Sequence, residues 1–256
     1  MNDNGGKRTG GGARFETRRL PLGHLEPPPA GTVDVWFLDL VRLGNPLHRD
    51  LEDASGFASP RAERTVRRFY TRLLLGAYLD LPGKDVHLVR SARGKPALDP
   101  SRHAQRLFHS VARSAGRCVV GVSAEVPVGV DLEPEDRRPG NALGVARRYF
   151  SDEEADRLAA LASPALDVAF MHTWACKEAV VKASGLGIAN QLCRFTVETD
   201  PSRPPAVLDF DGDAQAGWSL ALLQPEDGYL GALAIHGSIG RLETRRLAPA
   251  AAEPGP

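Results

Sequence analysis

The order in which helix-patterned and strand-patterned segments follow one another constrains the fold of this chain more than any other feature. One segment, 60–80, repeats apolar residues at helical spacing, and a second of about 21 residues begins after Ser163-Pro164 and ends at Gly185. The β-rich runs at 118–122 and 126–133 are typical of a hairpin. A short helix is expected at 151–162, and further strands at 33–40, 88–89, 193–199, 205–210, 217–223 and 229–236. This grouping favours the α+β class.

The two long helices also indicate how the chain is divided. Each is accompanied by several predicted strands, so we predict two similar lobes forming a pseudo-dimer, each a small sheet packed against a long helix. The N-terminal lobe would occupy 31–125 and the C-terminal lobe 126–246. The ends, 1–30 and 247–256, are rich in Gly, Arg, Ala or Pro and offer little apolar surface. We expect both to be disordered tails, because such segments cannot offset the entropy of ordering.

Composition and charge weigh against several classes of protein. Hydrophobic residues make up 42% of the 256 residues and charged residues 25%, as in an ordinary globular protein. Lys and Arg (32) balance Asp and Glu (32), so no global field favours an acidic membrane or nucleic acid, despite the arginines at 61–72. No apolar run approaches the roughly 20 residues that span a bilayer. We expect a soluble cytoplasmic monomer whose three cysteines are buried free thiols.

Carboxylates with regular spacing mark a candidate metal site in the second half of the chain. Asp131 and Glu133 lie two apart in a strand-like run, so they point to the same face. Trp174, Glu178 and Lys182 lie four apart on the second long helix and share one side. Each piece has a plainer explanation, because Asp131 and Glu133 suit a strand end and Glu178 with Lys182 suits a surface ion pair. Together, three carboxylates with room for water and phosphate favour Mg²⁺ over zinc.

Any phosphate ligand would have to be held by scattered cations. The chain contains neither a GxxxxGK[ST] loop nor a GxGxxG turn. Candidate cations are Arg72 on the first long helix, Lys95 in a Gly-Lys-Pro turn, His109, and Lys182 itself. Individually, each residue of this kind is more often an ordinary surface or core residue than a ligand.

Several motifs, taken in order, resemble those of the 4′-phosphopantetheinyl transferases, of the larger two-lobed type that activates surfactin and related synthetases. The resemblance covers about 65–240 and departs at Arg106 and Phe108, where the family often has Asn and then Ser or Thr before the histidine. The matching pieces are Arg72-Leu-Leu-Leu-Gly76, Gly94-Lys-Pro96, Phe108-His-Ser110, Val128-Gly-Val-Asp-Leu-Glu133, Arg148-Tyr-Phe-Ser151 and Trp174-Ala-Cys-Lys-Glu-Ala-Val-Val-Lys182-Ala-Ser-Gly185.

The resemblance implies that phosphopantetheine is transferred from coenzyme A to a serine of an acyl or peptidyl carrier protein, with release of adenosine 3′,5′-bisphosphate. It further implies roles for individual residues. Magnesium would be bound by Asp131, Glu133 and Glu178, with Glu178 and Lys182 as catalytic residues, and coenzyme A by Arg72, Lys95, Pro96, His109 and Lys182.

The sequence also allows an alternative function and suggests a surface for a partner. The alternative function is a non-catalytic homologue that binds coenzyme A or a carrier protein. Arginines between Glu133 and Ser151 are candidates for docking an acidic carrier protein, although a solvated loop and helix would look the same. These arginines are Arg137, Arg138, Arg147 and Arg148.

Overall fold

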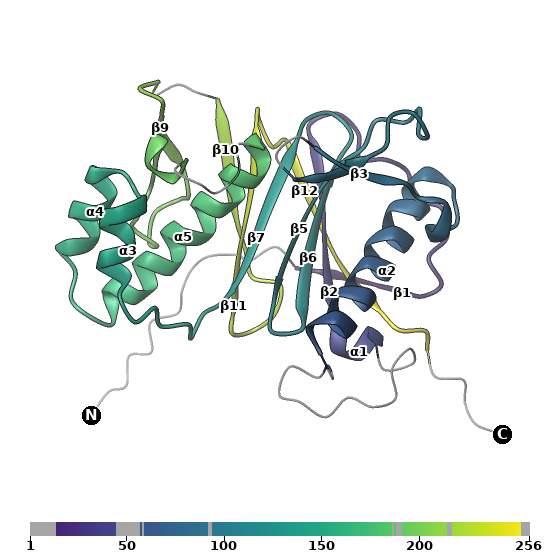
Figure 1. Ribbon diagram of the computed structural model, residues 1–256, viewed down its shortest axis with the longest axis horizontal. Helices are drawn as coiled ribbons and strands as arrows, with labels where there is room; N and C mark the ends of the chain where they lie inside the picture. Colours follow the sequence, from purple (N-terminus) through teal and green to yellow (C-terminus); the bar gives the residue numbers. More distant parts are fainter. Residues whose placement is uncertain are drawn as a thin grey trace.

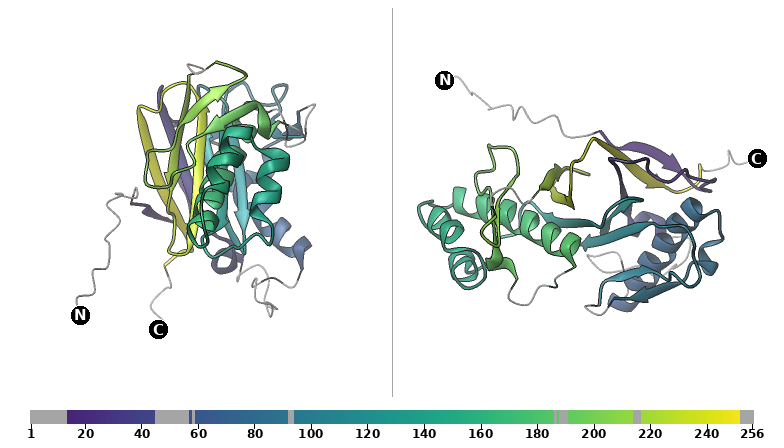
Figure 2. Two further views of the ribbon diagram at one scale, coloured as in Figure 1. Left: turned by 90° about the vertical axis from the view of Figure 1, so that its left-hand side faces the viewer. Right: turned by 90° about the horizontal axis from the view of Figure 1, so that it is seen from above.

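The computed structural model describes residues 14–44, 57, 59–91, 94–185, 187, 191–213 and 217–251. Two larger β-sheets lie between two groups of helices (Figure 1). On one side lie α3 (Ala142–Tyr149), α4 (Asp152–Ala159) and α5 (Ala165–Ser184), and on the other side lies α2 (Pro60–Leu79). The view from above in Figure 2 shows the same separation. The predicted α+β class is therefore confirmed.

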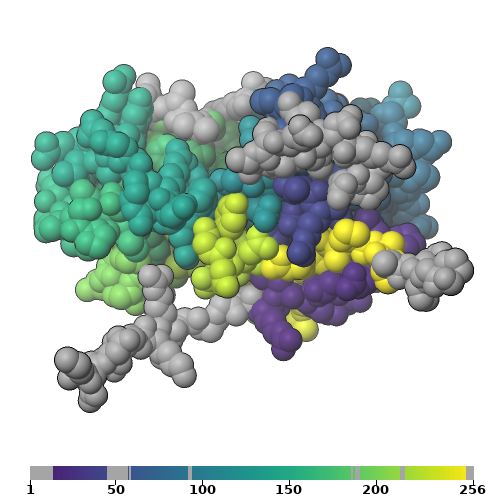
Figure 3. Space-filling model, turned by 90° about the horizontal axis from the view of Figure 1, so that it is seen from below, coloured from purple at the N-terminus to yellow at the C-terminus, as the bar shows by residue number. Residues whose placement is uncertain are grey.

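The larger sheet is built from both ends of the described chain. Its order is β1-β12-β2-β6-β5, and β12 is parallel to both of its neighbours, whereas the pairs β2–β6 and β6–β5 are antiparallel. In the space-filling view of Figure 3, the yellow residues of β12 run alongside purple residues from the start of the chain. The strands are β1 (Glu16–Arg19), β12 (Arg241–Ala248), β2 (Thr32–Asp39), β6 (Arg117–Ser123) and β5 (Phe108–Ser114).

Helix α2 packs on one face of this sheet because β2 is apolar on both faces. Trp36 and Leu38 belong to the core shared with α2, whereas Val35 and Phe37 belong to the core between the two sheets. Ser59 caps the start of α2, since its hydroxyl accepts a hydrogen bond from the amide of Ala62 at 3.2 Å. Small elements complete this side: α1 (Leu40–Gly44), a 3₁₀ turn (Gly83–Asp85), and the hairpin of β3 (Leu88–Arg90) and β4 (Pro96–Leu98).

The second sheet has three antiparallel strands and carries α5 on its outer face. Its order is β10 (Trp218–Leu223), β11 (Tyr229–His236) and β7 (Val128–Pro134). Valines of β7 and β2 meet in the core between the sheets. Beside α5 lie a 3₁₀ turn (Leu192–Arg194) and the pair β8 (Phe195–Val197) and β9 (Val207–Phe210). Helix α5 ends at Gly185, whose left-handed φ of 68° suits glycine, as predicted.

A buried ion pair fixes α5 against its neighbours. The ammonium group of Lys177 is fully buried and donates hydrogen bonds to Glu154 of α4, at 2.8 Å, and to the carbonyl oxygen of Phe195, at 2.6 Å. Glu154 also accepts from the amides of Ser151 and Val197, so it closes the predicted capping box of α4. Every oxygen of this carboxylate is used, which is the condition under which a buried ion pair is tolerated.

Several expectations from the sequence are wrong in the described residues. The runs at 118–122 and 126–133 do not form a hairpin, because β6 pairs with β2 and β5 while β7 pairs with β11. The expected tails contain β1 and the end of β12, and β12 places the last part of the predicted C-terminal lobe in the sheet of β2. The strand pairing of these polar, partly exposed segments satisfies their backbone groups. The rest of the expected tails, 1–13 and 252–256, lies outside the described residues.

Two further properties bear on the expected surroundings of the chain. Cys118 and Cys176 are buried free thiols as predicted, but Cys193, in the turn before β8, is exposed. Among the described residues, no helix combines the length and the apolarity that a membrane span requires.

Candidate active site between β7, α5 and α2

The outer face of β7 meets α5, and the predicted acidic residues lie on this interface. The apolar residues of β7 point into the core between the sheets, so the alternation of a strand turns Asp131 and Glu133 toward α5. Lys182 donates a hydrogen bond to Asp131 Oδ1 at 2.6 Å, and Trp174 Nε1 donates to Glu133 Oε1 at 3.1 Å. Glu178 lies one helical turn from each of these two α5 residues. The strand and the helix therefore bring the three carboxylates to one interface.

Glu178 is the most perturbed of these acidic groups. Only 6% of the residue is exposed, and burial raises the pKa of its carboxyl group to about 7, with the charges of Asp131 and Glu133 adding to the effect against Lys182. Glu178 therefore titrates in the neutral range. Asp131 is buried as well, and its second oxygen, Oδ2, has no hydrogen-bond partner among the described residues.

Glu133 differs from the other two carboxylates because both of its oxygens have partners. Oε1 accepts from Trp174, and Oε2 accepts from Arg137 Nη1 at 2.6 Å. Arg137 follows one short turn later, and half of its side chain is exposed. Glu133 is thus held between a helix residue and a surface arginine.

The three carboxylates have the right ligand atoms for a metal ion, but they are not placed as a complete metal site. The described part of the chain holds no set of three His, Cys, Asp or Glu side chains placed closely enough to bind a metal. The oxygen of Asp131 that has no partner among the described residues and the raised pKa of Glu178 nevertheless mark a place where a further positive charge would be favourable. Hard carboxylate oxygens of this kind suit Mg²⁺. A third ligand from Glu133 would require it to exchange its bond to Arg137.

A cleft of about 910 Å³ opens next to this interface, between α2, the β3–β4 hairpin, β5 and the end of α5. Among the described residues that line it, seven carry a positive charge and none is acidic. A cleft lined by one sign of charge concentrates the opposite sign, so this one favours a polyanion. The cations are Arg64, Arg67, Arg68, Arg72, Arg90, Lys95 and Lys182.

The four residues predicted to hold phosphate all line this cleft, together with Pro96, but one of them, His109, is not a cation at neutral pH. His109 is buried, and burial lowers its pKa to about 4, with the nearby charge of Lys95 adding to the effect, so the ring is neutral at pH 7. Burial also lowers the pKa of Lys95, to about 8. Three polar atoms of cleft residues are buried and lack hydrogen-bond partners in the described structure: Arg67 Nε, Thr71 Oγ1 and His109 Nδ1. A phosphate ligand would give such groups acceptors and a counter-charge.

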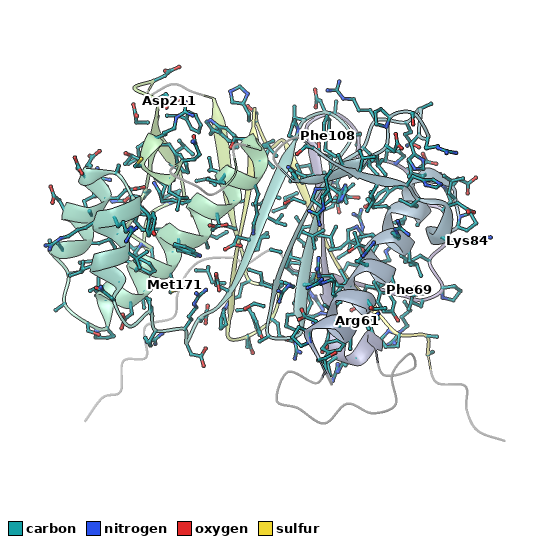
Figure 4. The ribbon with its side chains drawn as sticks, in the orientation of Figure 1. Arg61, Phe69, Lys84, Phe108, Met171 and Asp211 are labelled. Atoms are coloured by element: carbon teal, nitrogen blue, oxygen red, sulfur yellow. The ribbon has the colours of Figure 1, made fainter. Side chains whose placement is uncertain are left out.

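A smaller hollow of about 490 Å³ adjoins the cleft and shares Lys95, Pro96 and His109 with it. Much of its lining is apolar, including the ring of Phe108, over which the Arg106 guanidinium lies at 4.8 Å. In Figure 4 the side chain labelled Phe108 lies between the two groups of helices, at the upper ends of the strands. The two residues that depart from the family pattern thus form a stacked pair at this hollow.

The sequence interpretation missed most of the arginines in the cleft. It singled out Arg72, but Arg64 and Arg68 precede it at intervals of four, so all three share one side of α2. This four-residue spacing could have predicted from the sequence that the three arginines share one surface. Arg61, labelled near the lower end of α2 in Figure 4, is exposed and does not line the cleft.

This chain is similar in sequence to several known proteins. A family model described as the 4′-phosphopantetheinyl transferase superfamily matches residues 127–234, which include β7 and α5. The 4′-phosphopantetheinyl transferase HetI of Nostoc sp. is 30% identical over 73% of this chain and 77% of its own length. The 4′-phosphopantetheinyl transferase Sfp of Bacillus subtilis is 29% identical over 61% of this chain and 74% of its own. A crystal structure of a holo-(acyl-carrier-protein) synthase from Thermotoga maritima overlaps 44% of this chain and 64% of that chain, at 20% identity and a TM-score of 0.33.

Proposed function

Because this chain belongs to the 4′-phosphopantetheinyl transferase superfamily, we propose that it transfers the 4′-phosphopantetheine group of coenzyme A to a serine of an acyl or peptidyl carrier protein. One observation carries the proposal: a cleft whose charged residues, among those described, are all cationic ends at the interface that holds the buried carboxylates of Asp131 and Glu178. Coenzyme A brings three phosphate groups to the cleft. The carboxylates supply protein ligands for a divalent cation that also binds phosphate oxygens, and a base for the serine.

The cleft residues divide between the two ends of coenzyme A in this proposal. Arg72, Lys95 and His109 hold the adenosine end with its 3′-phosphate, and Pro96 packs near the base. Lys182 lies at the junction of the cleft and the carboxylates, so it contacts the diphosphate. The additional arginines of α2 add charge along the same wall. Phosphoryl transfer depends mainly on positioning and charge neutralisation, which such residues provide.

Magnesium is proposed as the cofactor, held by Asp131, Glu133 and Glu178. When bound, it would neutralise phosphate oxygens as charge develops on them. Asp131 offers a buried oxygen that has no partner in the described part of the chain, and Glu178 offers a carboxylate whose charged form is disfavoured by burial. Glu133 would contribute after releasing Arg137.

The chemical step needs a proton acceptor near the serine. The serine oxygen forms a bond to the β-phosphorus of coenzyme A while the bond to the α-phosphate oxygen breaks, and adenosine 3′,5′-bisphosphate leaves. Glu178 is the candidate to receive the serine proton; because a bound cation lowers the pKa of a carboxylate ligand below the value of about 7 in the metal-free protein, transfer through a water molecule is favoured. Lys182 offsets the negative charge that develops on the α-phosphate oxygen as adenosine 3′,5′-bisphosphate leaves.

The carrier protein is proposed to dock beside Glu133. Arg147 and Arg148 are exposed on α3, and the Arg148 guanidinium lies 5.3 Å from the ring centre of Tyr149, which is partly exposed. Because Arg137 also bonds Glu133, reversing Arg147 and Arg148 to Glu tests docking more cleanly. The KM for the carrier should rise severalfold, with coenzyme A binding unchanged. An unchanged KM would rule this surface out.

The remaining proposals concern the whole protein. We propose that the protein is cytoplasmic. We also propose that it is a monomer, because one chain supplies both walls of the cleft. The two lobes of the proposed pseudo-dimer correspond to α2 with the larger sheet and α5 with the smaller one. Their division near residue 126 is supported by the change of sheet between β6 and β7.

The function is tested by incubating the protein with Mg²⁺, coenzyme A and an apo-carrier protein, and then weighing the carrier for an added phosphopantetheine. Asp131→Ala and Glu178→Gln should abolish the gain in mass while the folded state remains, because each removes an oxygen donor from the interface. Binding of coenzyme A without any mass gain by the wild-type protein, across several carriers, would favour the non-catalytic alternative.

A further inference from the structure

The side chain of Lys95 leaves the hairpin of β3 and β4 and ends on the backbone of the other side of the cleft. Its ammonium group donates to the carbonyl oxygen of Val128 at 2.9 Å and to the carbonyl oxygen of Lys182 at 2.6 Å. Val128 is the first residue of β7, the strand of Asp131, and Lys182 lies in the last turn of α5. One side chain therefore contacts the backbone of both elements that form the carboxylate interface.

Placing the Lys95 ammonium group here costs free energy, because the charge loses part of its contact with water. Burial lowers the pKa of Lys95 to about 8, and none of the ion pairs between described residues gives it a carboxylate partner. Its two acceptors are main-chain carbonyls, and one of them belongs to the C-terminal end of α5, where the helix dipole favours a cation. An apolar side chain would fill the same space without burying a charge.

The contacts of Lys95 also determine where Lys182 can lie. The carbonyl oxygen of Lys182 accepts from Lys95, while the ammonium group of Lys182 donates to Asp131. The backbone of Lys182 is thus held from the cleft side and its side chain from the β7 side. Small displacements of groups around a reacting phosphate are enough to slow a reaction substantially.

We propose that Lys95 is a positioning residue, which holds the last turn of α5 against the start of β7 and thereby sets Lys182 opposite Asp131. The role rests on the proposed function, and it is additional to any contact that Lys95 makes with coenzyme A. Lys95 lines both the cleft and the smaller hollow. An anionic ligand bound in either space would supply the negative charge that no described residue gives Lys95 in an ion pair. Occupation of the cleft is in this way coupled to the order of the carboxylate interface.

The first arm of the test needs no activity and uses hydrogen–deuterium exchange of the free, full-length protein. Lys95→Met removes the donors and keeps most of the stem. It should speed exchange of the amides at 128–131 and 182–185, with α2 and β12 unchanged. Arg72→Met is the matched control, because it removes a cation from the same cleft without touching these carbonyls. Equal exchange at these amides in Lys95→Met and the wild type would overturn the proposal.

The second arm is kinetic. Lys95→Met should lower kcat at least about tenfold, whereas Arg72→Met should raise the KM for coenzyme A with a smaller effect on kcat. Lys95→Arg, which keeps charge and donors, should recover part of kcat, and Lys95→Gln serves if the Met variant does not fold. A raised KM for coenzyme A with an unchanged kcat in Lys95→Met would show that Lys95 only binds coenzyme A, and would overturn the positioning role. Inactivity of the wild type would contradict the proposed function, while the exchange arm would still decide the role of Lys95.

Discussion

The surroundings of Glu178 determine the pKa of its carboxyl group. Burial and two neighbouring carboxylates raise its pKa to about 7, so the free protein holds a partly protonated acid at neutral pH. A group with a higher pKa in the folded than in the unfolded state stabilises the protein below its ordinary pKa of 4.5, and this contribution is lost as the pH rises through 7. The ionised carboxylate of Glu178 therefore destabilises the folded state most at alkaline pH.

Glu178→Gln should accordingly stabilise the metal-free protein while it abolishes activity. The rise in pKa from 4.5 to about 7 corresponds to roughly 3 kcal/mol, which is an upper estimate of the gain in unfolding free energy at pH 8. At about pH 4 wild-type Glu178 is protonated in both the folded and the unfolded state, so the gain should nearly vanish. Urea unfolding at both pH values, with a chelator present, measures it. Asp156→Asn, at an exposed position of α4, is the control and should change little at either pH.

At the scale of elements, the contact between β7 and α5 depends on Gly129. A Cβ atom at this position would overlap the carbonyl oxygen of Ala179 and the amide nitrogen of Ala183. Gly129→Ala should therefore push the helix away from the strand and cost about 1–3 kcal/mol of stability. Transferase activity should fall further than stability, because Asp131 and Lys182 move apart.

The control for this prediction is Gly140→Ala, where an added Cβ meets nothing within 4 Å. Thermal unfolding and the carrier mass assay on both variants give the comparison. Wild-type activity in a folded Gly129→Ala protein would show that the close approach does not set the geometry of the site.

The buried pair of Lys177 and Glu154 connects α5 to α4 and β8. Lys177→Met leaves Glu154 buried with only backbone donors, so we expect a loss of about 3–5 kcal/mol in unfolding free energy. The exposed pair of Arg157 and Glu153, one turn apart on α4, provides the contrast. Arg157→Met should cost under about 1 kcal/mol. Denaturant unfolding of both variants tests the difference, and similar losses would contradict it.

At the scale of the whole molecule, the last strand completes the sheet of the first half of the chain. β12 lies between β1 and β2, Leu247 joins the core under α2, and Arg245 forms an ion pair with buried Asp34 at 2.7 Å. Asp34 also accepts from Tyr78 of α2. The C-terminal strand thus supports the helix that carries the cleft arginines.

Removal of residues 241–256 should therefore destabilise α2 although no cleft residue is lost. The edge of β2 would be exposed and Asp34 would lose its arginine, which alone is worth about 3–5 kcal/mol. A chain that ends at Ala251 keeps all of β12 and is the control. Circular dichroism and coenzyme A binding compare the two chains. Full stability and affinity in the shorter chain would show that β12 is dispensable.

The sequence by itself determined the approximate bounds of α2 and α5, the start of α4, and the shared face of Asp131 and Glu133, because caps and periodicity are local properties. The spacing of Arg64, Arg68 and Arg72 also places them on one side of α2, although the sequence interpretation singled out only Arg72. Only the tertiary structure decided which sheet β7 joins, where β12 inserts, and that Lys95 reaches the backbone of α5. Those features, like the pKa of Glu178, depend on pairing and burial between segments far apart in the chain, and no local pattern encodes which partner is met.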